Sequence, residues 1–167
     1  MLKDANLARC IFKSYRPISI TSMCSRLAER GVARLLLAEL SRDGVIRDNQ
    51  FGGRRGRGAD EALSYFCMST RDVVRADGEC HCIFLDIAKA FDRVQPLLLV
   101  HKLRGYGVSE VLLLWIYRFL TGRRHRVSVG SDTSDWVESS VGIPQGTVLG
   151  PILFSVFIND SSRLINL

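Results

Sequence analysis

The chain has 167 residues, of which 47% are apolar and 24% are charged, enough to build one ordinary domain and too apolar for an intrinsically disordered protein. Lys and Arg number 23 against 17 Asp and Glu, so the formal net charge is +6. That excess favours polyanionic partners without identifying one.

The first half of the chain is predicted to be helical after an extended start, because Pro17 biases the preceding residue away from the helical region. From about Ser22 to Leu40, apolar residues recur at three- and four-residue intervals beside charged residues such as Glu29, which is typical of an amphipathic helix. The glycine- and arginine-rich stretch FGGRRGRGAD then leads to a second helix, predicted from about Asp60 to Arg75.

The second half is predicted to mix strands and helices. The apolar run Cys82 to Leu85 is interpreted as a buried strand that delivers Asp86 at its carboxyl end. The other expected elements are helices at about 96–103, 110–120 and 151–159, and a hairpin that pairs Arg126–Val129 with Trp136–Ser139. The expected fold class is therefore α+β, in one compact unit.

Two kinds of site have no support in the sequence. The five cysteines contain no CxxC pair and have no companion histidines at zinc spacing, so we interpret them as reduced thiols. No uninterrupted apolar run approaches the length of a membrane span, so no membrane association is expected.

Asp86 is the candidate for metal-dependent chemistry. A carboxylate that directly follows a buried strand has rigid support, and hard cations such as Mg²⁺ prefer carboxylate oxygens. The backbone carbonyl of Ile87 would add a second oxygen to the same ion. Acidic residues also end many strands and cap many helices, so this pattern alone leaves a structural role open for Asp86 and favours one for Asp92.

Four segments, in order, resemble the motifs of reverse transcriptases, particularly those of non-LTR retrotransposons. KSYRPISI resembles the opening fingers motif and DNQFGGRRGRGADEAL the second. FLDIAKAFDRV resembles the first catalytic palm motif, and SSVGIPQGTVLGPILFSVFIND the palm motif with the Pro-Gln-Gly turn. The resemblance spans about Lys13 to Asp160. It implies part of a right-hand polymerase, with a small antiparallel sheet packed against several helices. Residues 1–80 would be mainly fingers and 81–167 the front part of the palm.

The resemblance also implies roles for individual residues. Asp86, with the carbonyl of Ile87, would bind a pair of Mg²⁺ or Mn²⁺ ions. Phe91 matches the steric gate, where a bulky ring collides with a 2′-hydroxyl and so favours deoxynucleotides; without the motif it would be an ordinary core residue. Gln145 and Gly146 match the turn that lines the incoming nucleotide, where glycine lets backbone approach closely.

Basic residues complete the implied site. Arg16 matches the fingers arginine that grips the triphosphate, and Lys13 would assist it. Contacts to template or primer are expected of Arg54, Arg55 and Arg57, and of Arg124 in a second basic cluster with Arg123 and Arg126. A solvated basic loop is an equally good interpretation of the first group, and the solvent-facing side of a hairpin is an equally good interpretation of the second.

The sequence departs from the family's pattern after the Pro-Gln-Gly turn. The resemblance implies two adjacent aspartates there that complete the metal site, and the 167 residues contain no such pair. Asp160 is expected not to substitute for them, because it falls at the end of the last predicted helix. We therefore expect the chain to stop before the active site is complete, without a thumb or nuclease region, and to expose a sheet edge.

Three functions follow as hypotheses. The first is RNA-directed DNA polymerase, which uses an RNA template, a DNA primer and deoxynucleoside triphosphates, in the nucleus or cytoplasm as its class implies. The second, favoured for these residues in isolation, is a catalytically inert nucleic-acid-binding remnant, because one carboxylate leaves the metals with too few ligands. The third, a nuclease using Asp86 and Asp92, leaves Arg16, Phe91 and Gln145 without purpose.

Overall fold

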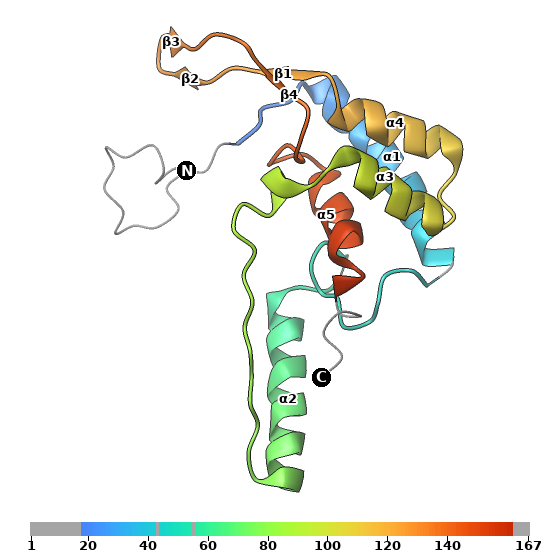
Figure 1. Cartoon of the computed structure of the whole chain (residues 1–167), viewed down its shortest axis with the longest axis vertical. Coiled ribbons are helices and arrows are strands. Elements are labelled where there is room, and N and C mark those ends of the chain that lie inside the picture. The colour runs from blue at the N-terminus through green and yellow to red at the C-terminus, as the bar shows by residue number, and fades with distance from the viewer. Residues whose placement is uncertain (1–17, 43, 55, 162–167) are drawn as a thin grey trace.

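The computed structural model describes residues 18–42, 44–54 and 56–161. Every predicted helix is present, and each end lies within two residues of its predicted position. A short 3-10 helix, η2 (Phe91–Arg93), precedes the third helix. Figure 1 shows the arrangement of the helices, which are α1 (Met23–Arg42), α2 (Ala59–Asp77), α3 (Pro96–Gly105), α4 (Glu110–Leu120) and α5 (Gly150–Ile158).

Local signals set the ends of these helices. At the start of α2, the carboxylate of Glu61 accepts a hydrogen bond from the N–H of Gly58 at 2.8 Å, which satisfies a free backbone donor. The helix ends at Gly78, whose φ of 83° is left-handed and whose N–H donates to the carbonyl of Val74. Pro96 begins α3, where its missing N–H costs no hydrogen bond.

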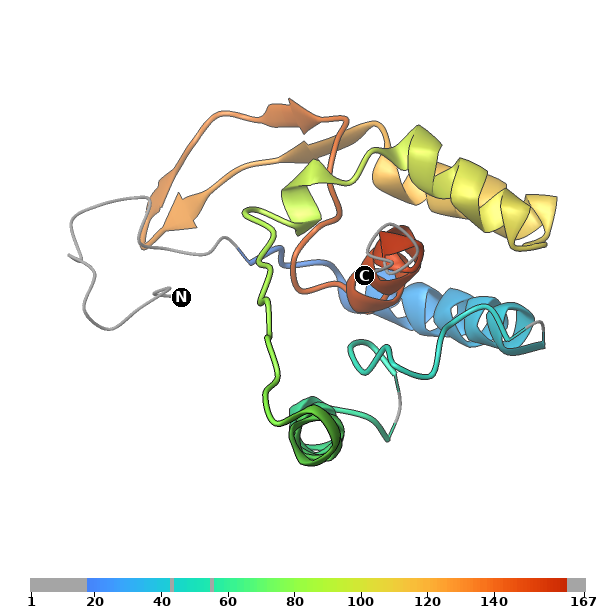
Figure 2. The ribbon, with the colours of Figure 1, turned by 60° about the horizontal axis from the view of Figure 1, so that its bottom comes forward.

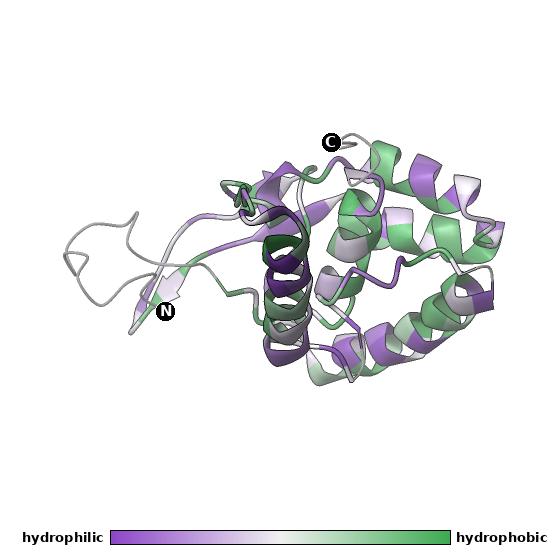
Figure 3. Ribbon diagram, turned by 90° about the horizontal axis from the view of Figure 1, so that it is seen from below, coloured by the Kyte–Doolittle hydropathy of each residue, from purple (hydrophilic) through white to green (hydrophobic). Residues whose placement is uncertain are grey.

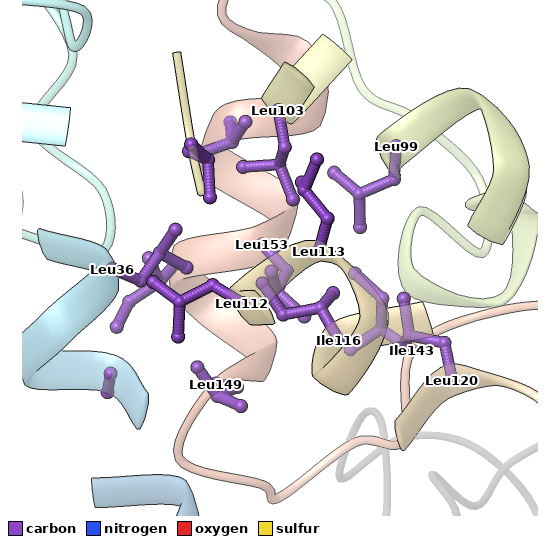
Figure 4. Packing of buried hydrophobic residues seen from close by; sticks show 14 of the residues in the cluster. Leu36, Leu99, Leu103, Leu112, Leu113, Ile116, Leu120, Ile143, Leu149 and Leu153 are labelled. Atoms are coloured by element: carbon purple, nitrogen blue, oxygen red, sulfur yellow. The ribbon is translucent and has the colours of Figure 1, made fainter. Parts of the chain in front are cut away.

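Helices α1, α3, α4 and α5 build one apolar core, seen from close by in Figure 4. A polar contact joins two of them, because the carboxylate of Glu39 in α1 accepts two hydrogen bonds from Ser109, the residue before α4, both at 2.9 Å. The apolar side chains of the core that are fully buried are Leu36, Leu40, Val94, Leu99, Leu103, Leu113, Ile116, Leu120, Leu149, Leu153 and Val156.

Helix α2 and the segment that follows it lie outside this core. No residue of α2 is buried, and the helix stands apart from the other four in Figures 1 and 2. Its side chains are nonetheless partly apolar, as the hydropathy colouring of Figure 3 shows, and Leu63 and Met68 are exposed. An extended segment runs back from α2 towards η2, and its Phe84 ring lies 5.5 Å from the ring of Phe66.

The prediction of a buried strand at Cys82–Leu85 is wrong. The segment is extended, but it joins no ladder among the described residues, and Ile83, Phe84 and Leu85 are 75%, 80% and 74% exposed. A strand is buried only where neighbouring strands and a covering layer surround it, and none of the described strands lies beside this one.

The predicted hairpin is present with a different pairing. Strand β1 (Arg123–His125) pairs with β4 (Val137–Ser139), and β2 (Ser128–Val129) pairs with β3 (Asp132–Thr133). The sheet expected to pack against helices is instead a protruding ribbon, because residues 124–138 are all exposed. Figures 1 and 2 show it extending away from the helices. The described fold is thus mixed, with five helices and two small antiparallel ladders.

Within the described ranges, no helix is both long enough and apolar enough to cross a membrane.

Candidate functional site

The Pro-Gln-Gly turn is held on one side by the residues that follow Pro17. The backbone N–H of Ser19 donates to the carbonyl of Gln145 at 2.8 Å. Gly146 has a φ of 95°, and a Cβ at that position would lie 3.1 Å from the Cγ2 of Ile18 and 3.3 Å from the carbonyl oxygen of Ser19. Gly146 therefore allows a close backbone approach to the segment Ile18–Ser19, while the approach to a nucleotide that was expected of it stays a prediction.

The other side of the turn is held by η2. The N–H of Ile143 donates to the carbonyl of Phe91 at 2.8 Å, and the N–H of Gly142 donates to the carbonyl of Val94 at 2.9 Å. Gly142 has a φ of 82°, and a Cβ there would lie only 3.0 Å from the Cα of Asp92. Segments from the two predicted palm motifs thus meet through backbone contacts that only glycine permits.

The ring of Phe91 has a packing role in this arrangement. It is half-buried against the core and stacks on the ring of Phe154 in α5, with centroids 4.9 Å apart and planes inclined by 23°. The backbone carbonyl of Phe91 accepts the hydrogen bond from Ile143, next to the Pro-Gln-Gly turn. The structure therefore contains the packing contact of an ordinary core phenylalanine at the position that matches the steric gate.

Asp86 is exposed at the end of the extended segment. A turn that includes Lys89 joins Asp86 to Phe91. Lys89 has a φ of 53°, and no other described residue except glycine has a positive φ. Strained backbone of this kind costs about 1–3 kcal/mol and is concentrated at functional sites. The extended segment gives the carboxylate no buried support, contrary to the expectation of a strand end.

The arginine loop before α2 folds on itself. The guanidinium of Arg54 donates to the carbonyl of Arg47 at 2.9 Å and lies 3.8 Å from the carboxylate of Asp48. Arg57 hydrogen-bonds the backbone carbonyl of Asp48, lies 3.5 Å from its carboxylate and covers the ring of Phe51 at 5.6 Å. Both guanidiniums thus have partners within the loop.

The depression beside this loop is lined by one guanidinium and three carboxylates among its described residues. Arg57 faces it together with Asp48, Asp60 and Glu61. Carboxylates at this density repel phosphate, so the described charges of the depression do not favour a polyanion.

Arg124 projects from the hairpin instead. Its guanidinium lies 5.7 Å from the centre of the Trp136 ring, and that of Arg126 lies 4.9 Å from the same ring. Three further basic residues with predicted roles, Lys13, Arg16 and Arg55, lie outside the described residues.

Comparison with known proteins decides the family. A family model described as "Reverse transcriptase (RNA-dependent DNA polymerase)" matches residues 3–167, nearly the whole chain. The chain belongs to the reverse transcriptase family.

Similar proteins place this reverse transcriptase chain near the enzymes of non-LTR retrotransposons. It is 36% identical over 157 residues to the probable RNA-directed DNA polymerase from transposon BS of Drosophila melanogaster, with 89% of this chain and 16% of that protein covered. It is 33% identical over 147 residues to the corresponding proteins of the X-element and of jockey, both of D. melanogaster, with 88% of this chain and 16% of each protein covered. No solved structure matches. The chain therefore spans about 16% of the length of these relatives.

Reverse transcriptases imply divalent metal ions, which need several oxygen ligands close together. The described residues contain no group of three His, Cys, Asp or Glu side chains that could hold one ion. Asp86 offers a single carboxylate, whereas Asp160 is engaged by Lys102, whose Nζ lies 2.6 Å from its Oδ1. The described residues by themselves do not fit the metal pair of a complete reverse transcriptase.

Glu29 is a residue of this reverse transcriptase site that the sequence analysis missed. It is fully buried, and its Oε2 accepts hydrogen bonds from the N–H groups of Val148 at 2.7 Å and Leu149 at 3.3 Å, directly before α5. The dipole of α5 favours a carboxylate there. The spacing Glu29, Ala33, Leu36 and Leu40 placed Glu29 on the apolar face of α1, and this signal was available in the sequence.

Arg123 is a second missed residue. Its guanidinium donates to the carbonyls of Leu120 at 2.9 Å, Val141 at 3.1 Å and Gly142 at 2.7 Å. Burial lowers the pKa of this guanidinium from its ordinary value, and the three carbonyls accept hydrogen bonds from its Nε and Nη2. Arg123 thus fixes the approach to the Pro-Gln-Gly turn rather than belonging to the exposed basic cluster with Arg124.

Proposed function

We propose that this chain is the fingers and the front part of the palm of an RNA-directed DNA polymerase of retrotransposon origin. Residues 1–80 would be mainly fingers and residues 81–167 palm. The observation that carries the proposal is the meeting of three motif segments at one turn, where backbone groups of Ser19 and Phe91 bond Gln145 and Ile143. In a polymerase, this junction lies at the incoming deoxynucleoside triphosphate.

The residues divide the work at this junction. Gln145 and Gly146 line the nucleotide, and the ring of Phe91 lies beneath its sugar. Arg16, assisted by Lys13, grips the triphosphate and offsets charge on the leaving pyrophosphate when the primer 3′-hydroxyl attacks the α-phosphate. Asp86 and the carbonyl of Ile87 offer oxygen ligands to the divalent ions.

The bases and phosphates of the RNA template and DNA primer need a separate surface. Arg54, Arg55, Arg57 and Arg124 are the candidate contacts in this proposal, because guanidiniums match phosphate oxygens in planar pairs. Arg124 has the better support among those described, since it projects from an exposed hairpin while Arg54 and Arg57 are partnered with Asp48.

A second candidate function applies to the 167 residues alone. The described residues offer the metals one exposed carboxylate, Asp86, without a second ligand cluster. We therefore expect the isolated chain to bind nucleic acid without incorporating nucleotides.

The experiment compares the isolated chain with a hybrid in which it replaces the matching segment of the transposon BS protein. We expect the hybrid to extend oligo(dT) on poly(rA) with Mg²⁺, and Asp86→Asn to lower its rate at least about 100-fold. The control Asp77→Asn, at the exposed end of α2, should leave the rate unchanged. A hybrid that folds without incorporating nucleotides, or an active Asp86→Asn variant, would contradict the polymerase proposal.

Phe91→Ala in the same hybrid tests the sugar gate. We expect ribonucleotide incorporation to rise more than deoxynucleotide incorporation falls, because the 2′-hydroxyl no longer meets the ring. Since Phe91 also stacks on Phe154, the variant is compared with Phe154→Ala, which loses the same stacking contact. Both variants should melt at a lower temperature, and only Phe91→Ala should change sugar selectivity. Unchanged selectivity would remove Phe91 from the gate.

A further inference from the structure

The exposed hairpin carries a cluster of one aromatic ring and two guanidiniums. Trp136 is 53% exposed, and the guanidiniums of Arg124 and Arg126 lie 5.7 and 4.9 Å from its centre. In the β1–β4 ladder, Arg124 lies opposite Glu138 and His125 opposite Val137. Continuing that register brings Arg126 opposite Trp136, so the three side chains share one face. We name Arg124, Arg126 and Trp136 the hairpin cluster.

The hairpin cluster contributes nothing to the core. Residues 124–138 are all exposed, and Trp136 belongs neither to the buried residues nor to the apolar side chains packed against them. An exposed cation–π contact stabilises a protein by only about 0.5–1 kcal/mol. A large aromatic ring that is half exposed and lies near two guanidiniums is therefore better explained by ligand binding than by a contribution to the stability of the fold.

The chemistry of the hairpin cluster selects the ligand. An indole face stacks on any nucleobase, and neighbouring guanidiniums pair with the phosphates on either side of that base, which is how single strands are bound without sequence preference. A base inside a duplex is stacked on its neighbours and has no free face for the indole. The ligand must therefore contain unpaired nucleotides.

We propose that the hairpin cluster binds an unpaired nucleotide of a single-stranded nucleic acid. Its base takes the place of a guanidinium that lies over the Trp136 ring in the free protein, and its flanking phosphates pair with Arg124 and Arg126. This inference rests on the proposed polymerase function and deepens it, since it makes Trp136 a nucleic-acid contact and assigns Arg124 to unpaired template rather than to duplex.

The remaining charges of the hairpin set a further expectation. Glu138 lies opposite Arg124 in the ladder, and no ion pair joins them among the described residues. Its carboxylate repels a phosphate that approaches Arg124. Glu138→Gln should therefore raise the affinity for single-stranded nucleic acid. If the hairpin had only a structural role, the substitution would leave that affinity unchanged.

The test uses the 167-residue chain carrying Trp115→Phe, which leaves Trp136 as the one tryptophan. We expect 12-residue oligo(dT) and oligo(rU) to quench its fluorescence saturably and a 12-base-pair duplex to do so far less. By anisotropy of labelled oligonucleotide, Trp136→Ala should weaken binding about 5- to 150-fold, and Trp136→Phe should retain part of the affinity. Replacing both arginines by Gln should reduce the slope of log K against log salt by about 1.4.

Matched controls separate the hairpin cluster from charge and folding effects. Arg34→Gln removes an exposed arginine from α1, and Val129→Ala trims an exposed apolar side chain from the same hairpin. Neither should weaken binding by more than about two-fold.

Any of three results would overturn the proposal: unaltered Trp136 fluorescence on binding, equal affinity after Trp136→Ala, or no oligonucleotide binding at low salt. The polymerase proposal is judged separately by nucleotide incorporation in the hybrid, which does not depend on Trp136 fluorescence.

Discussion

At the scale of single residues, the site depends on side chains and glycines that bring backbone segments together rather than on reactive groups. Because Gly142 has no Cβ, η2 can lie close to it; a Cβ there would be only 3.0 Å from the Cα of Asp92. Glu29 and Arg123 hold the chain on either side of the Pro-Gln-Gly turn. These residues make hydrogen bonds with main-chain atoms, so their loss displaces the turn as a whole.

Gly142→Ala should be strongly destabilising. The substitution forces a left-handed backbone on alanine, at about 1–3 kcal/mol, and also places its Cβ 3.0 Å from the Cα of Asp92. Gly130→Ala is the matched control, because its φ of 61° imposes similar strain with no atom within 4 Å. We expect Gly142→Ala to lower the free energy of unfolding in urea by at least about 1 kcal/mol more than the control. Equal losses would show that η2 does not approach Gly142 closely.

The sequence predicted Gln145 and Gly146 as a nucleotide-lining turn, and their close backbone contacts exist, although the nucleotide role stays a prediction. It did not predict Glu29 or Arg123 as supports. Glu29 was noted only as a charged residue of the amphipathic helix and Arg123 only as part of a basic cluster, because their partners are backbone groups elsewhere in the chain. The hydrogen bond of Glu29 to Val148 spans 119 residues, a pairing that local patterns do not contain.

At the scale of elements, α3 and α4 form a pair joined by a charged contact as well as by the core. Arg104 Nε and Nη2 donate to the two carboxylate oxygens of Glu110 at 2.7 and 2.9 Å. The hydrogen bonds from Arg104 lower the pKa of Glu110 from its ordinary value near 4.5. Ionised Glu110 therefore stabilises the fold above that ordinary value, and the contribution is lost as pH falls through the lowered pKa.

Glu110→Gln should lower the melting temperature at pH 7 by no more than about 3 °C, because the pair is exposed to solvent. Below the lowered pKa, Glu110 is protonated and resembles Gln, so the two melting temperatures should converge in acid. Thermal unfolding followed by circular dichroism from pH 7 to pH 2 checks this. In an Arg104→Gln background, Glu110→Gln should lower the melting temperature less, since only the interaction of Glu110 with the first turn of α4 is left to lose; a loss of unchanged size there would exclude the ion pair as its cause.

The elements differ in how far the sequence could predict them. Each helix has its signals within its own residues, such as Pro96 at the start of α3 or Gly78 after α2, so the ends were predicted within two residues. The segment Cys82–Leu85 has the composition of a buried strand, but burial depends on neighbours that the described structure does not place there. Strand pairing likewise depends on neighbouring residues outside each strand. The turn at Gly130 was therefore predicted correctly from local residues, whereas the pairing of the hairpin strands was not.

At the scale of the whole molecule, the apolar surface is unevenly distributed. Helices α1, α3, α4 and α5 share a close-packed core, whereas α2 and the extended segment display apolar side chains to solvent. An extended backbone with exposed Ile83, Phe84 and Leu85 is a template for pairing with other chains. We expect the isolated chain to associate through this segment.

Leu85→Lys should raise the concentration at which the isolated chain stays monomeric, since a charge on an exposed strand opposes pairing between edges. Leu85 is 74% exposed, so the free energy of unfolding should change little. Val111→Lys, on α4 and 79% exposed, is the matched control and should leave association unchanged. Sedimentation velocity over a concentration series measures both. Equal effects from the two lysines would mean that net charge, rather than this segment, controls association.

The hydrogen bond between Glu29 and Val148 also has a consequence during synthesis of the protein. The two residues are 119 positions apart, and a ribosome adds about 5–20 residues per second, so the carboxylate waits about 6–24 s for its partner to be made. Throughout that interval Glu29 lacks the backbone partner that it has in the fold, and α1 lacks α5 to cover its apolar face. Helix α1 is therefore among the last of the described helices to reach its final surroundings, and a newly made chain passes through a period in which chaperones can bind it.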